Sequence, residues 1–384
     1  MGAHPFLCCI SHNIPSWSGM SEFRYFYYFI LVIKFTIFAL RFLNLLKMKL
    51  RTLLIIAAMA VGVAAQAQTT SEKVKSFANE HMSLSGYLQG GFEYNEANDP
   101  STTFYLKRAR LSLTGNFLEE KMDFRLQVDM AGSPKICDLY FRYKPLNELN
   151  AQLGQFKLPF AMENELCGPT TFEFIEYSYL TMYLTRNANK YDGIAATGRD
   201  IGAQLYGGFI ARDGYSIINY NVGIYNGAGI NLKDNNSSKD FVGRVMVKPI
   251  KELSLSASYM YSVTNYGGDK YMEAPRWSVG AWYNSRHYVV RSEFAQANFG
   301  GNLTNTLYAL AGYHFEKPWS VVGRYEFIRD EANILNEERI TLAGVYKPYK
   351  FLRLQLDGSY VMNHRLDLNK PNTFGVNLLV TAIF

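Results

Sequence analysis

Runs of about ten residues, in which apolar and polar side chains alternate, constrain this chain more than any other feature. The final run is the clearest, with Gly375, Asn377 and Thr381 on its polar face. Its other face holds Phe374, Val376, Leu378, Val380, Ala382 and Phe384. A repeat of two residues is typical of a β-strand that has one apolar and one polar face.

Sixteen such runs can be traced through most of the chain. They lie at 84–94, 103–115, 121–131, 136–144, 150–158, 200–211, 214–225, 238–249, 252–264, 274–285, 286–297, 304–316, 319–329, 338–347, 350–361 and 372–384. An even number of strands suits a closed barrel, and sixteen leave room for a water channel. The boundary at residue 286 rests on one turn signal, Asn284-Ser285-Arg286.

The connectors between the runs alternate between tight turns and longer loops. The tight set is 118–120, 145–150, 212–213, 249–251, 285–286, 317–318 and 347–350. The longer set is 95–102, 132–135, 159–199, 226–237, 265–273, 298–303, 330–337 and 362–371, in which 132–135 is a short exception. Membrane barrels have short periplasmic turns and longer external loops. The alternation therefore favours a transmembrane barrel over a soluble sandwich, with both barrel ends of the chain on the periplasmic side.

Composition narrows the class of protein. The formal charge is +6, but residues 1–67 hold six bases and one acid, which leaves a balance of only +1 for residues 68–384. That balance argues against a nucleic-acid-binding protein, which would keep a basic surface. Beyond residue 67 no apolar run reaches about 18 residues, so a transmembrane helix is not expected there.

The N-terminal region carries an export signal. A basic segment with Lys49 and Arg51 follows Met48, an apolar segment spans 53–63, and Ala65-Gln66-Ala67 fits a cleavage site. We therefore interpret 48–67 as a signal peptide, 68–83 as a polar periplasmic lead and 84–384 as the barrel. Residues 1–47 are either a membrane anchor or sequence upstream of the true start, and we favour the second because a complete signal begins at Met48.

The connector at 159–199 is the longest. Long loops in compact folds usually have a function. As the third external loop it is expected to fold inward and narrow the pore, although an external flap or an oligomer clasp is the alternative.

The period-two pattern also assigns charges to the polar, lumen-facing side. The inward bases are Arg108, Arg110, Arg125, Arg244, Arg291, Arg324, Arg339 and Arg353, and the inward acids are Asp129, Glu293, Glu326 and Asp357. Arginine offers a planar fork of donors that suits phosphate or carboxylate. These rows predict a mild preference for anions, unless the acids simply neutralise them and stiffen the wall.

Several segments, taken in order, resemble the phosphate-selective porin O and P family. They are Lys107-Arg108-Ala109-Arg110-Leu111, Gly154-Gln155-Phe156-Lys157-Leu158-Pro159-Phe160 followed by Glu163, Phe174-Ile175-Glu176, Gly198-Arg199-Asp200-Ile201-Gly202, and Gly223-Ile224-Tyr225-Asn226-Gly227-Ala228-Gly229. The resemblance implies a sixteen-stranded, usually trimeric porin in the outer membrane of a Gram-negative bacterium. A terminal strand that ends on an aromatic, here Phe384, resembles the signal read by the barrel-assembly machinery.

Phosphate selectivity is a weaker implication of this resemblance. In the family it rests on a ladder of arginines and a lysine cluster at the constriction. The expected constriction residues here include Lys157, Glu163, Arg186, Lys190 and Arg199, and the loop also carries Glu165, Glu173, Glu176 and Asp192. A constriction rich in carboxylates would disfavour phosphate.

Other chemistry has little support in the sequence. His364 with Asp367 is one candidate catalytic pair and His287 another candidate base, and Asp234-Asn235-Asn236 could bind a cation, but solvated loops explain them better. Cys137 and Cys167 could form a disulfide, and nothing in their spacing indicates a metal site. Tyr259, Tyr261, Tyr346 and Tyr349 fit interfacial girdles, with sugar stacking as the alternative.

The expected function is therefore passive diffusion of small hydrophilic solutes, including anions such as phosphate or polyphosphate, through a homotrimeric porin without cofactor or metal. Two rival hypotheses are an outer-membrane barrel hydrolase and a closed structural or adhesive barrel.

Overall fold

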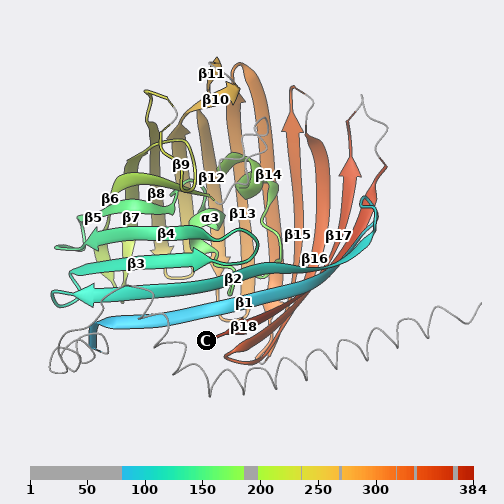
Figure 1. Cartoon of the computed structure of the whole chain (residues 1–384), viewed down its shortest axis with the longest axis horizontal. Helices are drawn as coiled ribbons and strands as arrows, with labels where there is room; N and C mark the ends of the chain where they lie inside the picture. Colours follow the sequence, from blue (N-terminus) through green and yellow to red (C-terminus); the bar gives the residue numbers. More distant parts are fainter. Residues whose placement is uncertain are drawn as a thin grey trace, which may run out of the picture. The chain divides into compact units, whose positions relative to one another are not determined.

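The computed structural model describes residues 80–185, 198–234, 236–267, 270–316, 318–332, 335–365 and 371–384. Within these residues, sixteen antiparallel strands form one closed barrel, and β10 and β11 form a separate two-stranded sheet (Figure 1). The predicted segments 1–47 and 48–67, and most of 68–83, lie outside the described residues. No helix in the described ranges has the length and apolar character needed to cross a membrane.

The barrel strands follow one another around the wall in chain order, and β18 returns to pair with β1. Their bounds are β1 (Met82–Asn95), β2 (Thr102–Phe117), β3 (Met122–Asp129), β4 (Lys135–Tyr143), β5 (Asn150–Lys157), β6 (Arg199–Arg212), β7 (Tyr215–Tyr225), β8 (Asp240–Ile250), β9 (Leu253–Tyr261), β12 (Arg276–Asn284), β13 (Tyr288–Phe299), β14 (Asn302–His314), β15 (Trp319–Asp330), β16 (Asn336–Tyr349), β17 (Leu352–Asn363) and β18 (Thr373–Ile383). Each of the sixteen predicted runs overlaps one of these strands, including the pair on either side of the weak boundary at residue 286.

One predicted strand was too long. The run 252–264 ends as a barrel strand at Tyr261, and the chain then forms the hairpin of β10 (Val263–Gly267) and β11 (Lys270–Glu273). Ser262 and Ala274 close its base through an N–H to carbonyl bond of 2.8 Å. The hairpin strands pair only with each other. Their side chains still alternate, so the alternation continues past the point where the chain leaves the wall.

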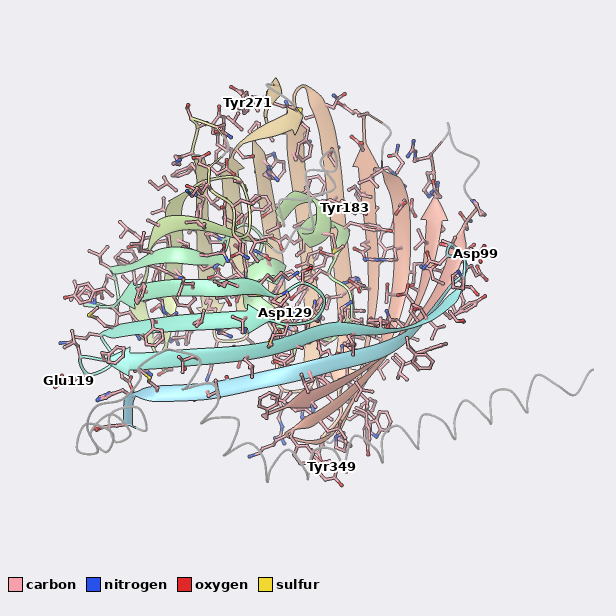
Figure 2. The ribbon with its side chains drawn as sticks, viewed as in Figure 1. Asp99, Glu119, Asp129, Tyr183, Tyr271 and Tyr349 are labelled. Atoms are coloured by element: carbon pink, nitrogen blue, oxygen red, sulfur yellow. The ribbon has the colours of Figure 1, made fainter. Side chains whose placement is uncertain are left out.

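The two faces of the wall differ as the alternation predicts. Large apolar side chains such as Leu106, Phe104 and Leu342 are exposed on the outer face. Polar side chains such as Gln89 and Thr381 are buried on the inner face, where they bond to each other. In Figure 2 Glu119 and Tyr349, on tight turns, lie along one rim of the barrel, and Asp99 and Tyr271, on longer loops, lie along the other.

A β-bulge changes the inner face of β2. Gln89 of β1 pairs with Arg108, but the next residue, Gly90, pairs with Leu106, so Lys107 has no partner in the ladder. An extra residue in one strand shifts the alternation by one position. Lys107 therefore joins Arg108 on the inner face, where strict alternation would have placed it toward lipid.

The segment 158–198 connects β5 to β6 and is called the inner loop below. Its described part contains a short helix α3 (Met162–Leu166) and a π-helical turn η1 (Leu180–Thr185). It bonds to polar side chains of strands as far apart as β1, β8, β13 and β17. Because these side chains lie on the inner face of a closed wall, the described part of the loop lies inside the barrel, as Figure 1 shows for α3.

Apolar side chains of the inner loop fill part of the interior. Phe160, Met162, Leu180 and Leu184 are fully buried and pack in one cluster with wall residues such as Trp282. Burial of each such side chain contributes about 1.5–3 kcal/mol. This packing occupies the side of the lumen along β7 to β16.

Candidate solute pathway through the barrel

Carboxylates hold the inner loop by its backbone. Glu293 accepts a hydrogen bond from the Met162 N–H at 3.2 Å, Glu326 accepts one from the Tyr179 N–H at 2.6 Å, and Asp357 accepts one from the Ile175 N–H at 2.7 Å. These three acids come from β13, β15 and β17. They are buried and were predicted to point inward, and their partner proves to be the loop backbone rather than a solute.

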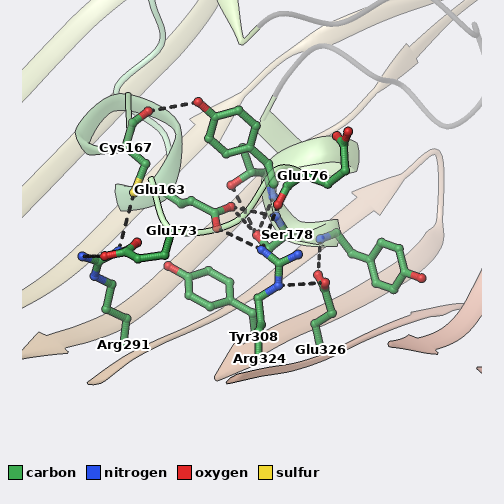
Figure 3. Close-up of polar contacts among 12 residues, drawn as sticks. Glu163, Cys167, Glu173, Glu176, Ser178, Arg291, Tyr308, Arg324 and Glu326 are labelled. Atoms are coloured by element: carbon green, nitrogen blue, oxygen red, sulfur yellow. Dashed lines mark hydrogen bonds and ion pairs between the residues drawn. The ribbon is translucent and has the colours of Figure 1, made fainter. Parts of the chain in front are cut away.

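The four loop carboxylates among the described residues each face a base. Glu173 pairs with Arg291 at 2.9 Å, and Glu163 lies 3.8 Å from Arg324 (Figure 3). Glu165 pairs with Arg244, and Glu176 pairs with Lys107. The loop is therefore rich in carboxylates in its sequence, but these four do not face the pathway as bare negative charges.

The pair of Lys107 and Glu176 shows how burial and a neighbouring charge oppose each other in their effect on a carboxyl group. Burial alone would raise the pKa of the Glu176 carboxyl, but the adjacent Lys107 ammonium outweighs burial and lowers that pKa from its ordinary value. Glu176 therefore stays ionised at neutral pH and neutralises Lys107.

The strands β2 to β4 carry an excess of positive charge on their inner face. We call the following set the basic wall: Lys107, Arg108, Arg110, Arg125, Arg142, Lys144 and Arg199 of the adjoining β6. Its acids are Asp123, Asp129 and Asp138. Arg142 and Lys144 share Asp123, and Arg125 and Arg199 share Asp138, so the bases exceed the acids.

Two arginines of the basic wall are the least neutralised. Arg108 donates to the neutral Gln89 at 2.8 Å, and no carboxylate of the described residues lies within ion-pair distance of it. Arg125 lies 3.7 Å from Asp138, has a side chain that is 36% exposed, and donates from one Nη to the Ser112 hydroxyl at 3.3 Å, while its Nε is buried out of reach of a solute. Both guanidinium groups retain donors that a passing anion can use.

The remaining predicted pore arginines are occupied. Arg110 pairs with Asp129 at 2.8 Å. Arg244 and Arg291 bind carboxylates of the inner loop, while Arg324, Arg339 and Arg353 donate to backbone carbonyls of the same loop. The structure thus divides the predicted ladder into residues that hold the loop and residues that remain open to the lumen.

The predicted constriction residues are similarly occupied. Lys157 donates to the carbonyls of Asn164 and Cys167, and Arg199 binds Asp138 at 2.7 Å. Arg186 and Lys190 lie outside the described residues.

Sequence reasoning missed some inward bases. Arg142 shares the parity of Asp138 in β4, and Arg276 shares that of Ser278 in β12, so the alternation contained the signal for both. Arg276 donates to the Leu184 carbonyl and holds the end of the described inner loop. Lys107 was missed although the pattern contains the bulge, since the outward apolar residues change from even positions (Phe104, Leu106) to odd positions (Ala109, Leu111) on either side of it.

The other candidate sites fall partly outside the described residues, as Asp367 and Asn235 do. His364 lies 3.3 Å from Glu338, whereas its proposed partner Asp367 is outside the described residues. The described ranges contain no group of three or more residues that could hold a metal ion. The possible disulfide is wrong, since Cys137 and Cys167 are both free and buried. Burial raises the pKa of the Cys167 thiol well above its ordinary value, which keeps it unreactive.

Comparison with known proteins agrees with this geometry. The family model for phosphate-selective porin O and P matches residues 64–273, which is more than half of the chain. The chain belongs to this porin family. A search of curated proteins found no relative.

Solved structures share the fold of this porin at low identity. An anion-selective porin from Comamonas acidovorans is 17% identical, with a TM-score of 0.64, and covers 79% of this chain and 99% of its own. The outer membrane channel DcaP of Acinetobacter baumannii is 14% identical (TM-score 0.60; 79% and 97% covered). OmpT of Vibrio cholerae, in its trimer form, is 13% identical (TM-score 0.56; 79% and 99% covered).

Family and fold together make this protein a channel of the Gram-negative outer membrane, with its apolar face against lipid and its polar face lining the interior. They indicate a channel without enzymatic activity.

Proposed function

We propose that this porin passes small hydrophilic solutes by diffusion and prefers anions, and that the basic wall provides the preferred path. The proposal rests on one observation. Arg108 and Arg125 are the least neutralised bases of a wall whose bases exceed its acids. The similar porin from Comamonas acidovorans is anion-selective, which supports the same preference for anions.

The position of the inner loop strengthens the electrostatic argument. Apolar packing of the loop fills the side along β7 to β16, so we expect solutes to pass nearer to the basic wall. In a narrow, low-dielectric channel, charges of one sign raise the local concentration of the opposite ion. Since the four loop carboxylates are paired with bases, they do not cancel this field.

The first test is the reversal potential of purified protein in a planar bilayer under a KCl gradient. We expect a potential that reports chloride preference. The double variant Arg108→Gln/Arg125→Gln should reduce the chloride-to-potassium permeability ratio by about twofold or more, because it removes two lumen charges.

Arg212→Gln is the matched control, since Arg212 lies beside Asp213 at an exposed tight turn. It should leave the ratio unchanged. An unchanged ratio in the double variant would overturn the proposed path, and absence of any conductance would favour a closed structural barrel.

Phosphate preference is the finer part of the proposal. Guanidinium groups with unused donors bind phosphate oxygens through paired hydrogen bonds. If Arg108 or Arg125, which lie at separate levels of the wall, forms such a station, low phosphate should reduce the chloride current of the wild type but not of the double variant. Indifference of both proteins to phosphate would leave a general anion channel.

The assembly part of the proposal is a homotrimer, inserted by the barrel-assembly machinery through the strand that ends at Phe384. The similar OmpT of Vibrio cholerae has a trimer form, which supports this oligomeric state. Light scattering of the detergent-purified protein would measure it.

A further inference from the structure

A cavity lies on the inner face next to the basic wall, toward the tight turns. It has a volume of about 560 Å³, within the range of small-molecule sites. Strands β5 to β8 form it, together with Glu165 of α3. Its lining includes the tight-turn residues Asn147 and Gly214, so it opens on the side of the barrel that carries the tight turns.

Strand register explains the composition of this cavity. Asn150 pairs with Tyr206, Tyr206 pairs with Asn221, and Asn221 pairs with Arg244, which sets four inward side chains in one row. The adjacent row is formed by Gly208, Asn219 and Met246. Neighbouring strands lie about 4.8 Å apart, so the two rows form one continuous, mostly polar surface that includes the Tyr206 ring.

Gly208 lets Ser216 approach this surface closely. A Cβ at Gly208 would clash with the Ser216 hydroxyl and lie 3.2 Å from the Asn219 Oδ1. The φ of Gly208 is not positive, so the backbone itself does not require glycine. The Ser216 side chain therefore takes the place of a side chain at position 208 and lines the cavity beside Asn219.

Charge in the cavity is balanced. Arg244 binds Glu165 and also donates to the Asn221 Oδ1 at 3.2 Å. The other polar side chains of the two rows are amides and a phenol. The charges within these two rows are therefore balanced, and the nearest base of the basic wall is Arg142, beside Tyr206.

The amides retain unused hydrogen-bonding capacity. Asn219 donates to the Ser216 carbonyl at 2.9 Å, and this leaves its Oδ1 without a donor among the described residues. Asn221 accepts from Arg244, and this leaves its Nδ2 without an acceptor there. An acceptor and a donor on neighbouring strand positions, beside an aromatic ring, match the hydroxyl groups and the apolar C–H face of a sugar.

We propose that this cavity binds a small neutral polyhydroxylated solute, such as a free monosaccharide, on the side of the inner loop nearest the tight turns. The site is independent of the anion path. It gives the porin a second class of solute, held by amides rather than by guanidinium groups.

Saturation-transfer NMR on detergent-purified trimer or monomer, with glucose as the probe, tests the site directly. We expect a saturable glucose signal that inorganic phosphate does not compete away. Asn219→Leu should weaken glucose binding by about tenfold, because an apolar group cannot replace the lost acceptor.

Asn377→Leu is the matched control. Asn377 is an inward amide of β18 that accepts one side-chain hydrogen bond, from Tyr105. It should retain wild-type glucose binding. Because either variant could fold poorly, Asn221→Leu gives a second reading, since it removes the unused Nδ2 donor and should also weaken glucose binding.

Three results would overturn the proposal. They are no saturable glucose signal in the wild type, equal loss in Asn219→Leu and Asn377→Leu, or full displacement of glucose by phosphate. The reversal potential of Asn219→Leu should equal that of the wild type, which separates failure here from failure of the anion proposal.

Discussion

At the scale of single residues, charge pairing decides what the lumen offers to a solute. Lys107 and Arg108 are neighbours on the same inner face, yet Glu176 neutralises Lys107, while Arg108 has only the neutral Gln89. Counting inward bases would treat them as equal. The charge that a solute meets therefore comes from the bases that have no carboxylate partner. The inner loop determines which bases these are, because its carboxylates pair with the others.

Glu176→Gln should release Lys107 and increase anion preference. We expect the chloride-to-potassium ratio to rise by about twofold, since a lumen cation loses its counterion. The reversal potential in a KCl gradient measures it. Glu331→Gln, on an exposed loop, is the control, because a glutamine there keeps the acceptor used by the Leu303 N–H.

The same pair predicts a dependence on pH. The pKa of Glu176 is lowered by Lys107 from its ordinary value of 4.5, so the pair stays ionised as pH falls from 7 to 5. Its contribution to stability is present above the ordinary value and is lost as pH falls through the lowered one. Anion preference in the wild type should rise only in that acid range, and Glu176→Gln should lack this step. A step near pH 6 that disappears in Glu176→Gln would contradict the assignment.

At the scale of elements, the inner loop depends on one unusual backbone position. Ala161 precedes α3, is fully buried, and has φ of 61° and ψ of 148°. Non-glycine residues rarely adopt positive φ, and the cost is on the order of 1–3 kcal/mol. This strained turn directs the Met162 N–H toward Glu293.

Ala161→Gly should keep or raise the unfolding midpoint in urea, because glycine tolerates this conformation. Ala295→Gly is the matched control, since Ala295 is also fully buried but lies in β13 without a positive φ. That change should lower stability by about 0.5–1 kcal/mol. Equal losses in the two variants would show that Ala161 is not strained.

The sequence predicted the strands of the wall better than the course of the loop. Alternation in the wall reflects lipid on one side and polar groups on the other, and both are local consequences of the strand period. The bonds from Glu326 and Asp357 to the loop backbone join residues about 150 or more positions apart, so no local pattern contains them. The hairpin of β10 and β11 was missed because it leaves the ladder while the alternation continues. The bulge at Lys107 was missed although the change of apolar parity after Leu106 marks it in the sequence.

At the scale of the whole molecule, closure of the barrel depends on the contact between its first and last strands. The Gly86 N–H donates to the Phe384 carbonyl at 2.8 Å, and the Phe384 N–H donates to the Gly86 carbonyl at 3.0 Å. A Cβ at Gly86 would lie 2.6 Å from the Arg110 carbonyl oxygen and 2.7 Å from the Phe384 ring. The seam therefore requires a residue without a side chain at this point.

Gly86→Val should reduce the folded fraction of the protein in outer membranes severalfold, because the valine clashes with both neighbours of the seam. Heat-modifiable migration on gels measures the folded fraction. Gly323→Val is the control, since a Cβ there meets no atom within 4 Å. Normal folding of Gly86→Val would show that the seam can adjust.

The pairing of the inner loop with the wall also bears on how this porin can diversify. Glu173 and Arg291, or Glu165 and Arg244, lie on segments far apart in the chain, yet loss of either partner leaves a buried charge uncompensated. A loop with a different arrangement of carboxylates therefore requires a wall with a matching arrangement of guanidinium groups. We expect these positions to change together among relatives, so that exchanging the loop alone between two porins would yield a chimera that folds poorly, whereas exchanging it with its partner residues would preserve the barrel.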